Sequence, residues 1–99
     1  MNQQELRILS QAQAEIERAF EWYYCRSSAV AEAFLVEVGS ALEKISAHPQ
    51  LYSPYLKKAR RYILETFPYS VIFRQIDNKI LVIAVAHAKR CPDYWIKRA

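Results

Sequence analysis

The sequence contains a single glycine, Gly39, among its 99 residues. Phosphate-binding loops and dinucleotide-binding turns need several glycines at fixed spacing, because only glycine lets the backbone approach a phosphate closely. These two nucleotide-binding classes are therefore excluded. The chain also lacks the G-x-S-x-G motif of serine hydrolases and the H-E-x-x-H motif of zinc proteases.

Metal ligands and disulfide partners are also scarce. The two cysteines, Cys25 and Cys91, lie far apart in the sequence, and His48 and His87 are the only histidines. Neither pair has the spacing of a metal site. We therefore expect no metal and no cofactor, and we expect the two thiols to be reduced and packed, as is usual inside cells.

Long apolar segments are absent too. No apolar run reaches the roughly 20 residues that a helix needs to cross a bilayer. Polar residues follow the first methionine, where a signal peptide would be basic and then apolar. We expect a cytoplasmic protein that has no membrane partner.

The composition that remains suits one folded domain, expected over residues 1–99. Hydrophobic residues make up 53% of the chain, which is enough to form a core. The charges are unevenly distributed: residues 1–50 hold seven acids and four bases, and residues 51–99 hold three acids and ten bases. This asymmetry predicts a basic face that binds nucleic acid or an acidic protein, or one that only keeps the protein soluble.

A first helix is expected over residues 10–26. Ser10 and Gln13 have the spacing of a capping box at its start. Apolar residues then recur every three or four positions, the period of a helix with one buried side. The buried side would hold Ala12, Ile16, Ala19, Phe20 and Tyr23, and the solvent side Glu15, Glu17, Arg18 and Glu21.

A second helix is expected from Ser27, its N-cap, to about His48. It ends there because the following residue, Pro49, disfavours helical geometry in the residue before it. Gly39 costs a helix about 1 kcal/mol relative to alanine, so we expect a close helix–helix contact at that position. The short break between the two helices predicts an antiparallel hairpin.

Strands follow a loop that spans residues 48–59. The hydrophobic period changes to two, which predicts strands near residues 62–65, 69–76 and 79–86, and a further short strand is expected at 5–10. Asp77 and Asn78 form a credible two-residue turn. The predicted fold class is α+β, in the order β-α-α-β-β-β, with the helical hairpin packed on a small, mainly antiparallel sheet.

The segment AVAHAKRCPDYW, residues 84–95, carries most of the reactive side chains. An apolar strand ends at His87, which could be a general acid or base or a hydrogen-bonded structural group. Lys89 and Arg90 could neutralise phosphate or pair with acidic side chains. Tyr94 could stack on a base or donate a proton, and Trp95 could close the core. The basic clusters Lys57, Lys58, Arg60, Arg61 and Lys97, Arg98 could lie at the same rim of the sheet.

Several motifs together resemble the RelE/ParE superfamily of toxins. They are RRYILETFPYSVIF at 60–73 and ILVIAVAHAKRCPDYWIKR at 80–98, with WYYCRS at 22–27 and HPQLYSP at 48–54. The likeness covers nearly the whole chain, and the expected order of elements matches that family's fold. The resemblance implies a growth-inhibiting toxin of a type II toxin–antitoxin pair, a role associated with plasmid stabilisation. It also implies a cognate antitoxin that binds the toxin as a hetero-oligomer.

The superfamily has two main branches with different targets. RelE-like toxins cleave mRNA on the ribosome, and ParE-like toxins inhibit DNA gyrase without being nucleases. Glu65 stands where RNA-cleaving relatives commonly have an arginine, and a carboxylate there would repel the scissile phosphate. Arg90 matches a basic position of the nucleases, and Tyr94 lies near their tyrosine in a shifted register. A ParE-like gyrase inhibitor is favoured on this basis.

Two alternatives remain. A RelE-like ribosome-dependent endoribonuclease would use Arg90, Tyr94, Lys89 and His87, and a nonenzymatic nucleic-acid-binding module would use the basic half of the chain. The expected antitoxin-binding residues are Phe20, Trp22, Tyr23 and Tyr24. The expected target-binding residues are Arg60, Arg61, His87, Lys89, Arg90, Tyr94, Trp95, Lys97 and Arg98.

Overall fold

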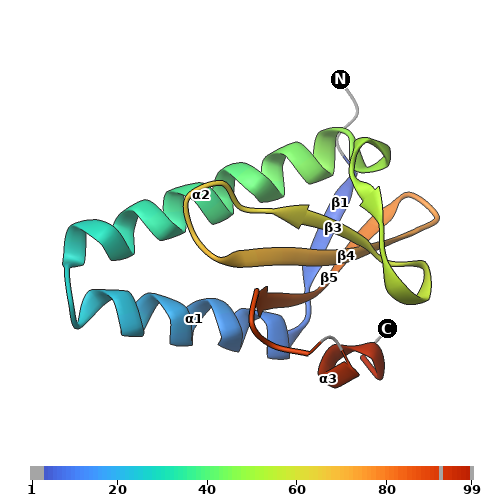
Figure 1. The fold of residues 1–99 in the computed structure, drawn as a ribbon. Helices are drawn as coiled ribbons and strands as arrows, with labels where there is room; N and C mark the ends of the chain where they lie inside the picture. The colour runs from blue at the N-terminus through green and yellow to red at the C-terminus, as the bar shows by residue number, and fades with distance from the viewer. Residues whose placement is uncertain (1–3, 92, 99) are drawn as a thin grey trace.

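A computed structural model describes residues 4–91 and 93–98 (Figure 1). A hairpin of two long helices covers one face of a five-stranded sheet, which confirms the predicted α+β class and order of elements. The short strand β2, the short helix α3 and two 3-10 turns were not predicted. The elements are β1 Glu5–Ile8, α1 Ser10–Tyr24, α2 Ser28–Ala47, η1 Pro49–Leu51, β2 Ser53–Pro54, η2 Leu56–Lys58, β3 Arg60–Ile63, β4 Tyr69–Ile76, β5 Lys79–His87 and α3 Asp93–Ile96.

Helix α1 begins without the predicted capping box. Leu9, which has extended backbone angles, is the N-cap residue, and no side chain caps the helix. Ser10 is already inside the helix, so its hydroxyl cannot reach the amides that a cap residue would bond. The amide of Gln13 instead donates to the Leu9 carbonyl at 2.9 Å.

Helix α2 begins as predicted, because the Ser27 side chain accepts a hydrogen bond from the Val30 amide at 3.3 Å. The close contact expected at Gly39 is wrong. Gly39 is exposed, and a Cβ added there would meet nothing within 4 Å. Its side of α2 therefore faces open space, and the hairpin packs through other residues.

The sheet has the strand order β1-β5-β4-β3-β2. Strand β1 runs parallel to β5, and all other pairs are antiparallel, as expected for a mainly antiparallel sheet. Strand β1 pairs only as far as Val82, so among the described residues no strand covers that side of the second half of β5. Asp77 takes positive φ in the β4–β5 turn, as the sequence indicated, but Asn78 does not.

A register shift between Ile72 and Phe73 changes which side chains of β5 share a face. The sequence period placed His87 with Leu81, Ile83 and Val85. In the structure, Val85 packs in the core under the helices, whereas Ile83 packs on the opposite face. A bulge of one residue reverses the alternation of side chains along a strand, and the sequence carries no signal for it.

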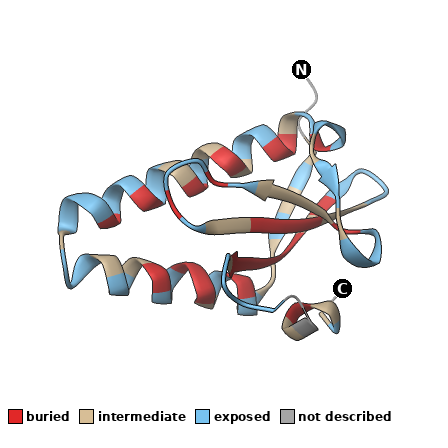
Figure 2. Cartoon of the chain, viewed as in Figure 1, coloured by how far each residue is buried: buried red, intermediate tan, exposed pale blue. Residues whose placement is uncertain are grey.

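Two apolar clusters stabilise the sheet from its two faces. The larger one lies between the sheet and the helical hairpin, where buried positions line the inner sides of α1 and α2 (Figure 2). The smaller one lies on the outer face, which Trp95 of α3 covers with only 1% of its surface exposed. Trp95 therefore closes this second cluster, as the sequence suggested.

Cys25 and Cys91 form no disulfide, but both are exposed, so the expectation of packed thiols is wrong. In the part of the chain that the structure describes, no helix is both long and apolar enough to cross a membrane.

Candidate binding groove

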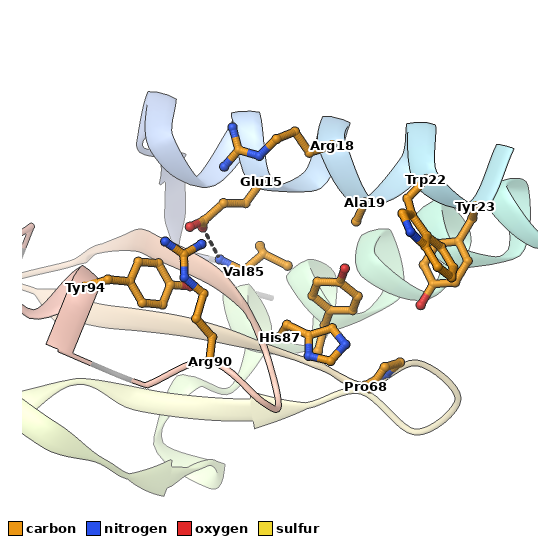
Figure 3. A pocket seen from close by; sticks show the side chains of 11 residues that line it. Glu15, Arg18, Ala19, Trp22, Tyr23, Pro68, Val85, His87, Arg90 and Tyr94 are labelled. Carbon is orange, nitrogen blue, oxygen red and sulfur yellow. Dashed lines mark hydrogen bonds between the residues drawn. The ribbon is translucent and has the colours of Figure 1, made fainter. Parts of the chain in front are cut away.

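A groove of about 540 Å³ runs between α1 and the ends of β4 and β5 (Figure 3). One wall comes from α1, where Glu15, Arg18, Ala19 and Trp22 recur at the spacing of one helical side. The floor and opposite wall come from the sheet and the segment after β5. The groove is lined by Glu15, Arg18, Ala19, Trp22, Tyr23, Pro68, Tyr69, Val85, His87, Arg90 and Tyr94.

Glu15 is the most deeply enclosed charge in this groove, with 6% of its surface exposed. Its Oε1 accepts a hydrogen bond from the Val85 amide at 2.9 Å (Figure 3). Its Oε2 lies 3.1 Å from Nη2 of Arg98, an ion pair whose two side chains are both largely buried. Placing Glu15 on the solvent side of the first helix was therefore wrong.

Glu15 and Arg98 together occupy the edge of β5 that β1 leaves uncovered. Arg98 also donates through Nη1 to the Ile83 carbonyl at 3.1 Å. A carboxylate thus accepts from one backbone amide of β5 and a guanidinium donates to one backbone carbonyl, as a neighbouring strand would. Side chains that cover an edge in this way also discourage unwanted strand pairing.

Tyr94 is held between two arginines at the rim of the groove. The guanidinium carbons of Arg90 and Arg98 lie 3.7 and 5.1 Å from its ring centre. Its hydroxyl is enclosed and has no hydrogen-bond partner among the described atoms. Burial raises the pKa of Tyr94 to about 12, and the charge of Glu15 raises it as well, whereas Arg90 and Arg98 lower it.

His87 lies where the groove meets the outer face of the sheet. Its Nδ1 accepts a hydrogen bond from the Lys89 amide at 3.1 Å, and its ring stands edge-on to Tyr69 at 5.0 Å. The amide of Arg90 donates to the His87 carbonyl at 3.0 Å, so a tight turn follows β5 directly. The two hydrogen bonds, from the Lys89 amide to Nδ1 and from the Arg90 amide to the carbonyl, fix the direction in which the chain leaves β5.

The predicted target-binding residues do not all meet at one rim. Arg61 stacks on Tyr55 at 4.1 Å and borders a hollow of about 50 Å³ on the outer face, whereas Tyr94 borders the groove. Arg90 and His87 border both.

The other members of the predicted set lie elsewhere. Arg60 donates to the Tyr52 carbonyl at 2.7 Å, and Arg98 is paired with Glu15. Lys89 and Lys97 are exposed, and Trp95 is buried.

The aromatic residues predicted to bind an antitoxin divide into two kinds. Trp22 and Tyr24 are 54% and 56% exposed, and Arg26 stacks on Trp22 at 3.6 Å. Tyr23 instead packs into the core, with its ring 5.1 Å from that of Phe67. Phe20 is partly buried and lies 5.6 Å from Tyr24.

Sequence reasoning missed Glu15, Arg18, Ala19, Pro68, Tyr69 and Val85 as groove residues. The signal for Glu15 was present, because it follows Ala12 by three positions and precedes Ala19 by four, which places it on the buried side of α1. The alternation along β4 places Tyr69 on the same face as Val71 and Phe73. It does not show that Pro68 and Tyr69 meet the end of β5, because that depends on the pairing of β4 with β5.

The fold is a helical hairpin packed over a mixed five-stranded sheet, an α+β class. A solved structure described as "Chromosomal ParDE TA system from P. aeruginosa" is similar to it with a TM-score of 0.68. The two chains are 19% identical over 90% of this chain and 100% of that one. No curated protein sequence is similar enough to this chain to count as a match.

The sequence gives the family more directly. Residues 6–92 match the family described as "ParE toxin of type II toxin-antitoxin system, parDE". The chain therefore belongs to the ParE toxin family, as the resemblance to the RelE/ParE superfamily predicted.

Proposed function

We propose that this chain inhibits bacterial growth by binding DNA gyrase and that it has no nuclease activity of its own. Support comes from carboxylates placed where an RNA-cleaving site needs positive charge. His87, Arg90 and Tyr94 of the predicted nuclease set border one groove, but the buried carboxylate of Glu15 lines it as well. Glu65 is exposed in the β3–β4 connection, where its amide donates to the Glu37 carboxylate of α2.

Tyr94 is also poorly suited to move a proton. A general base or acid works best when its pKa is near the working pH. The pKa of Tyr94 is raised to about 12, and its hydroxyl is enclosed beside a buried carboxylate. The geometry instead supports a structural role in which Tyr94 holds Arg90 at the rim of the groove, where a protein target could meet the guanidinium.

One observation favours the alternative of a RelE-like endoribonuclease. Arg61, His87 and Arg90 border a single hollow on the outer face of the sheet. Two guanidinium groups and an imidazole could stabilise a phosphorane and accept a proton from the 2′-hydroxyl. This alternative needs only His87 as the base and does not need Tyr94.

Two assays on the purified protein distinguish the two functions. We expect DNA supercoiling by gyrase to fall as toxin is added, and we expect mRNA in a translating extract to remain intact. Arg90→Ala should reduce the inhibition, and Lys44→Gln, an exposed substitution on α2, should not. Full supercoiling at a large excess of toxin would end the gyrase proposal, and codon-positioned cleavage that is lost in His87→Ala would establish the alternative.

We further propose that the groove binds a cognate antitoxin in the cytoplasm. The P. aeruginosa structure carries the description of a ParDE system. In this chain, Trp22 and Tyr23 offer apolar surface beside the positive charges of Arg18 and Arg90. This combination suits an amphipathic segment that has acidic side chains along its edge.

A further inference from the structure

A second hollow, of about 340 Å³, lies on the outer face of the sheet. It is lined by Lys57 and Lys58 of the loop before β3, Arg74 of β4 and Ile96 of α3. Arg74 belongs to the same face of β4 as Ile72, which packs under Trp95, and not to the face that the helical hairpin covers. We propose that Lys57, Lys58 and Arg74 bind the phosphate groups of a nucleic-acid backbone.

The backbone of the loop turns both lysines toward the same hollow. Lys57 and Lys58 have φ values of 54° and 63°, in the left-handed region that residues other than glycine and asparagine rarely adopt. Consecutive side chains of an extended segment would point to opposite sides. Two backbone hydrogen bonds close the turn, from Tyr55 to Ala59 at 2.7 Å and from Ala59 to Leu56 at 2.9 Å.

The three cations have no acidic partner among the side chains that the structure describes. The two ion pairs found there are Arg7 with Glu5 and Arg98 with Glu15. The Nε atom of Arg74 is enclosed and donates to no acceptor among the described atoms. Like charges around one hollow raise each other's electrostatic energy, and an anion placed between them lowers it.

A phosphate chain fits these cations better than the carboxylates of an acidic peptide. On the same face Arg61 is stacked on Tyr55, and Tyr55 lies 5.9 Å from Trp95. Proteins that bind single-stranded nucleic acid without sequence preference combine cations that follow the backbone with aromatic or guanidinium planes on which bases stack. An acidic peptide offers carboxylates but no base to stack on Arg61 and Tyr55, so this pair favours a nucleic acid.

This binding is independent of the proposed action on gyrase. The hollow shares no lining residue with the groove between α1 and the sheet. A partner in that groove would therefore leave Lys57, Lys58 and Arg74 accessible. Nucleic-acid binding can be measured on the toxin alone, so its failure would leave the gyrase proposal standing, and the reverse also holds.

The test uses the full chain and a fluorescent single-stranded oligonucleotide, with anisotropy measured over a range of salt concentrations. Each phosphate contact on a single strand contributes about 0.7 to the slope of log affinity against log salt. We expect Arg74→Gln to reduce that slope by about 0.7, and the double variant Lys57→Gln with Lys58→Gln to reduce it by about 1.4. Lys44→Gln on α2 removes one charge from the helical layer and should leave the slope unchanged.

Two results would overturn the proposal. One is a salt slope in the lysine double variant equal to that of Lys44→Gln. The double variant should still fold, because it changes only exposed loop side chains. The other is equally tight binding of poly-glutamate of the same total charge, because the hollow would then recognise acidic protein segments. Thermal unfolding of each variant checks that Arg74→Gln still folds.

Discussion

Glu15 lies on the buried stripe of α1, although its chemistry suggests solvent. Its carboxylate is stabilised by the Val85 amide at 2.9 Å and by Arg98 at 3.1 Å. Burying a carboxylate is unfavourable unless such partners compensate for its lost hydration. The ion pair also connects α1, near the start of the chain, to Arg98, two residues after the end of α3.

Glu15→Gln should therefore destabilise the fold. The amide oxygen of glutamine can still accept from Val85, but Arg98 loses its counter-charge while remaining largely buried. Removing one partner of a buried ion pair typically costs about 3 to 5 kcal/mol. Urea unfolding measures the loss, and Glu17→Gln, on the exposed side of the same helix, should change stability by less than about 0.5 kcal/mol. Equal effects of the two substitutions would mean that the buried pair contributes nothing.

Tyr94 makes the stability of the protein depend on pH at the alkaline end. Its pKa rises from 10.0 to about 12 on folding, because burial and Glu15 disfavour the phenolate. The stabilisation is complete below pH 10 and is lost as the pH rises through the folded value. We expect Tyr94→Phe to lose less stability than the parent between those two values. An NMR titration should also show the last tyrosine ring to ionise disappearing in this variant.

At the scale of elements, α2 is destabilised by a glycine in its interior, and nothing in the described structure requires a glycine there. Gly39 is in the middle of the helix and a Cβ there would meet nothing within 4 Å. Gly39→Ala should stabilise the protein by about 1 kcal/mol, because alanine loses less backbone entropy on forming a helix. Thermal unfolding measures the gain. Ala33→Gly, also at an exposed position of α2, is the matched reverse change and should destabilise the protein by a similar amount.

The long elements were predictable because each carries an apolar pattern over many positions. Helix α2 buries residues at helical spacing, and β4 and β5 are largely apolar stretches of eight and nine residues, so the structure gives bounds close to those expected. Strand β2 has two residues and α3 has four, too few for a period to appear. The predicted capping box failed because Ser10 entered the helix, so Leu9 became the cap residue.

At the scale of the whole molecule, the candidate site depends on contacts that sequence spacing does not encode. The basic clusters lie within one half of the chain, yet Arg61 and Tyr94 border different hollows. Arg98 of the same basic half forms an ion pair with Glu15 near the other end of the chain, a contact that local spacing does not predict. Sequence could identify the cationic side chains but not which of them would be used in holding the fold together.

Helix α1 carries exposed aromatic side chains that do not contribute to the core. Trp22 is 54% exposed at the edge of the groove. Arg26, two residues after the end of α1, stacks on its ring, and Tyr23 meets it edge-on. Large aromatic side chains at such positions are frequent hot spots of protein binding. If the groove holds the antitoxin, Trp22→Ala should weaken the complex by at least about 2 kcal/mol, or about 30-fold in Kd.

Isothermal titration with a cognate antitoxin measures that affinity. Leu51→Ala is the matched control, because Leu51 is 74% exposed in η1 and does not line the groove. Both substitutions should leave the unfolding temperature nearly unchanged, since each removes a mostly exposed side chain. Equal affinities for the two variants would place the antitoxin elsewhere on the molecule. Another partner would then have to bind the groove, where Trp22 is exposed and where, among the described residues, Arg18 and Arg90 form no ion pair.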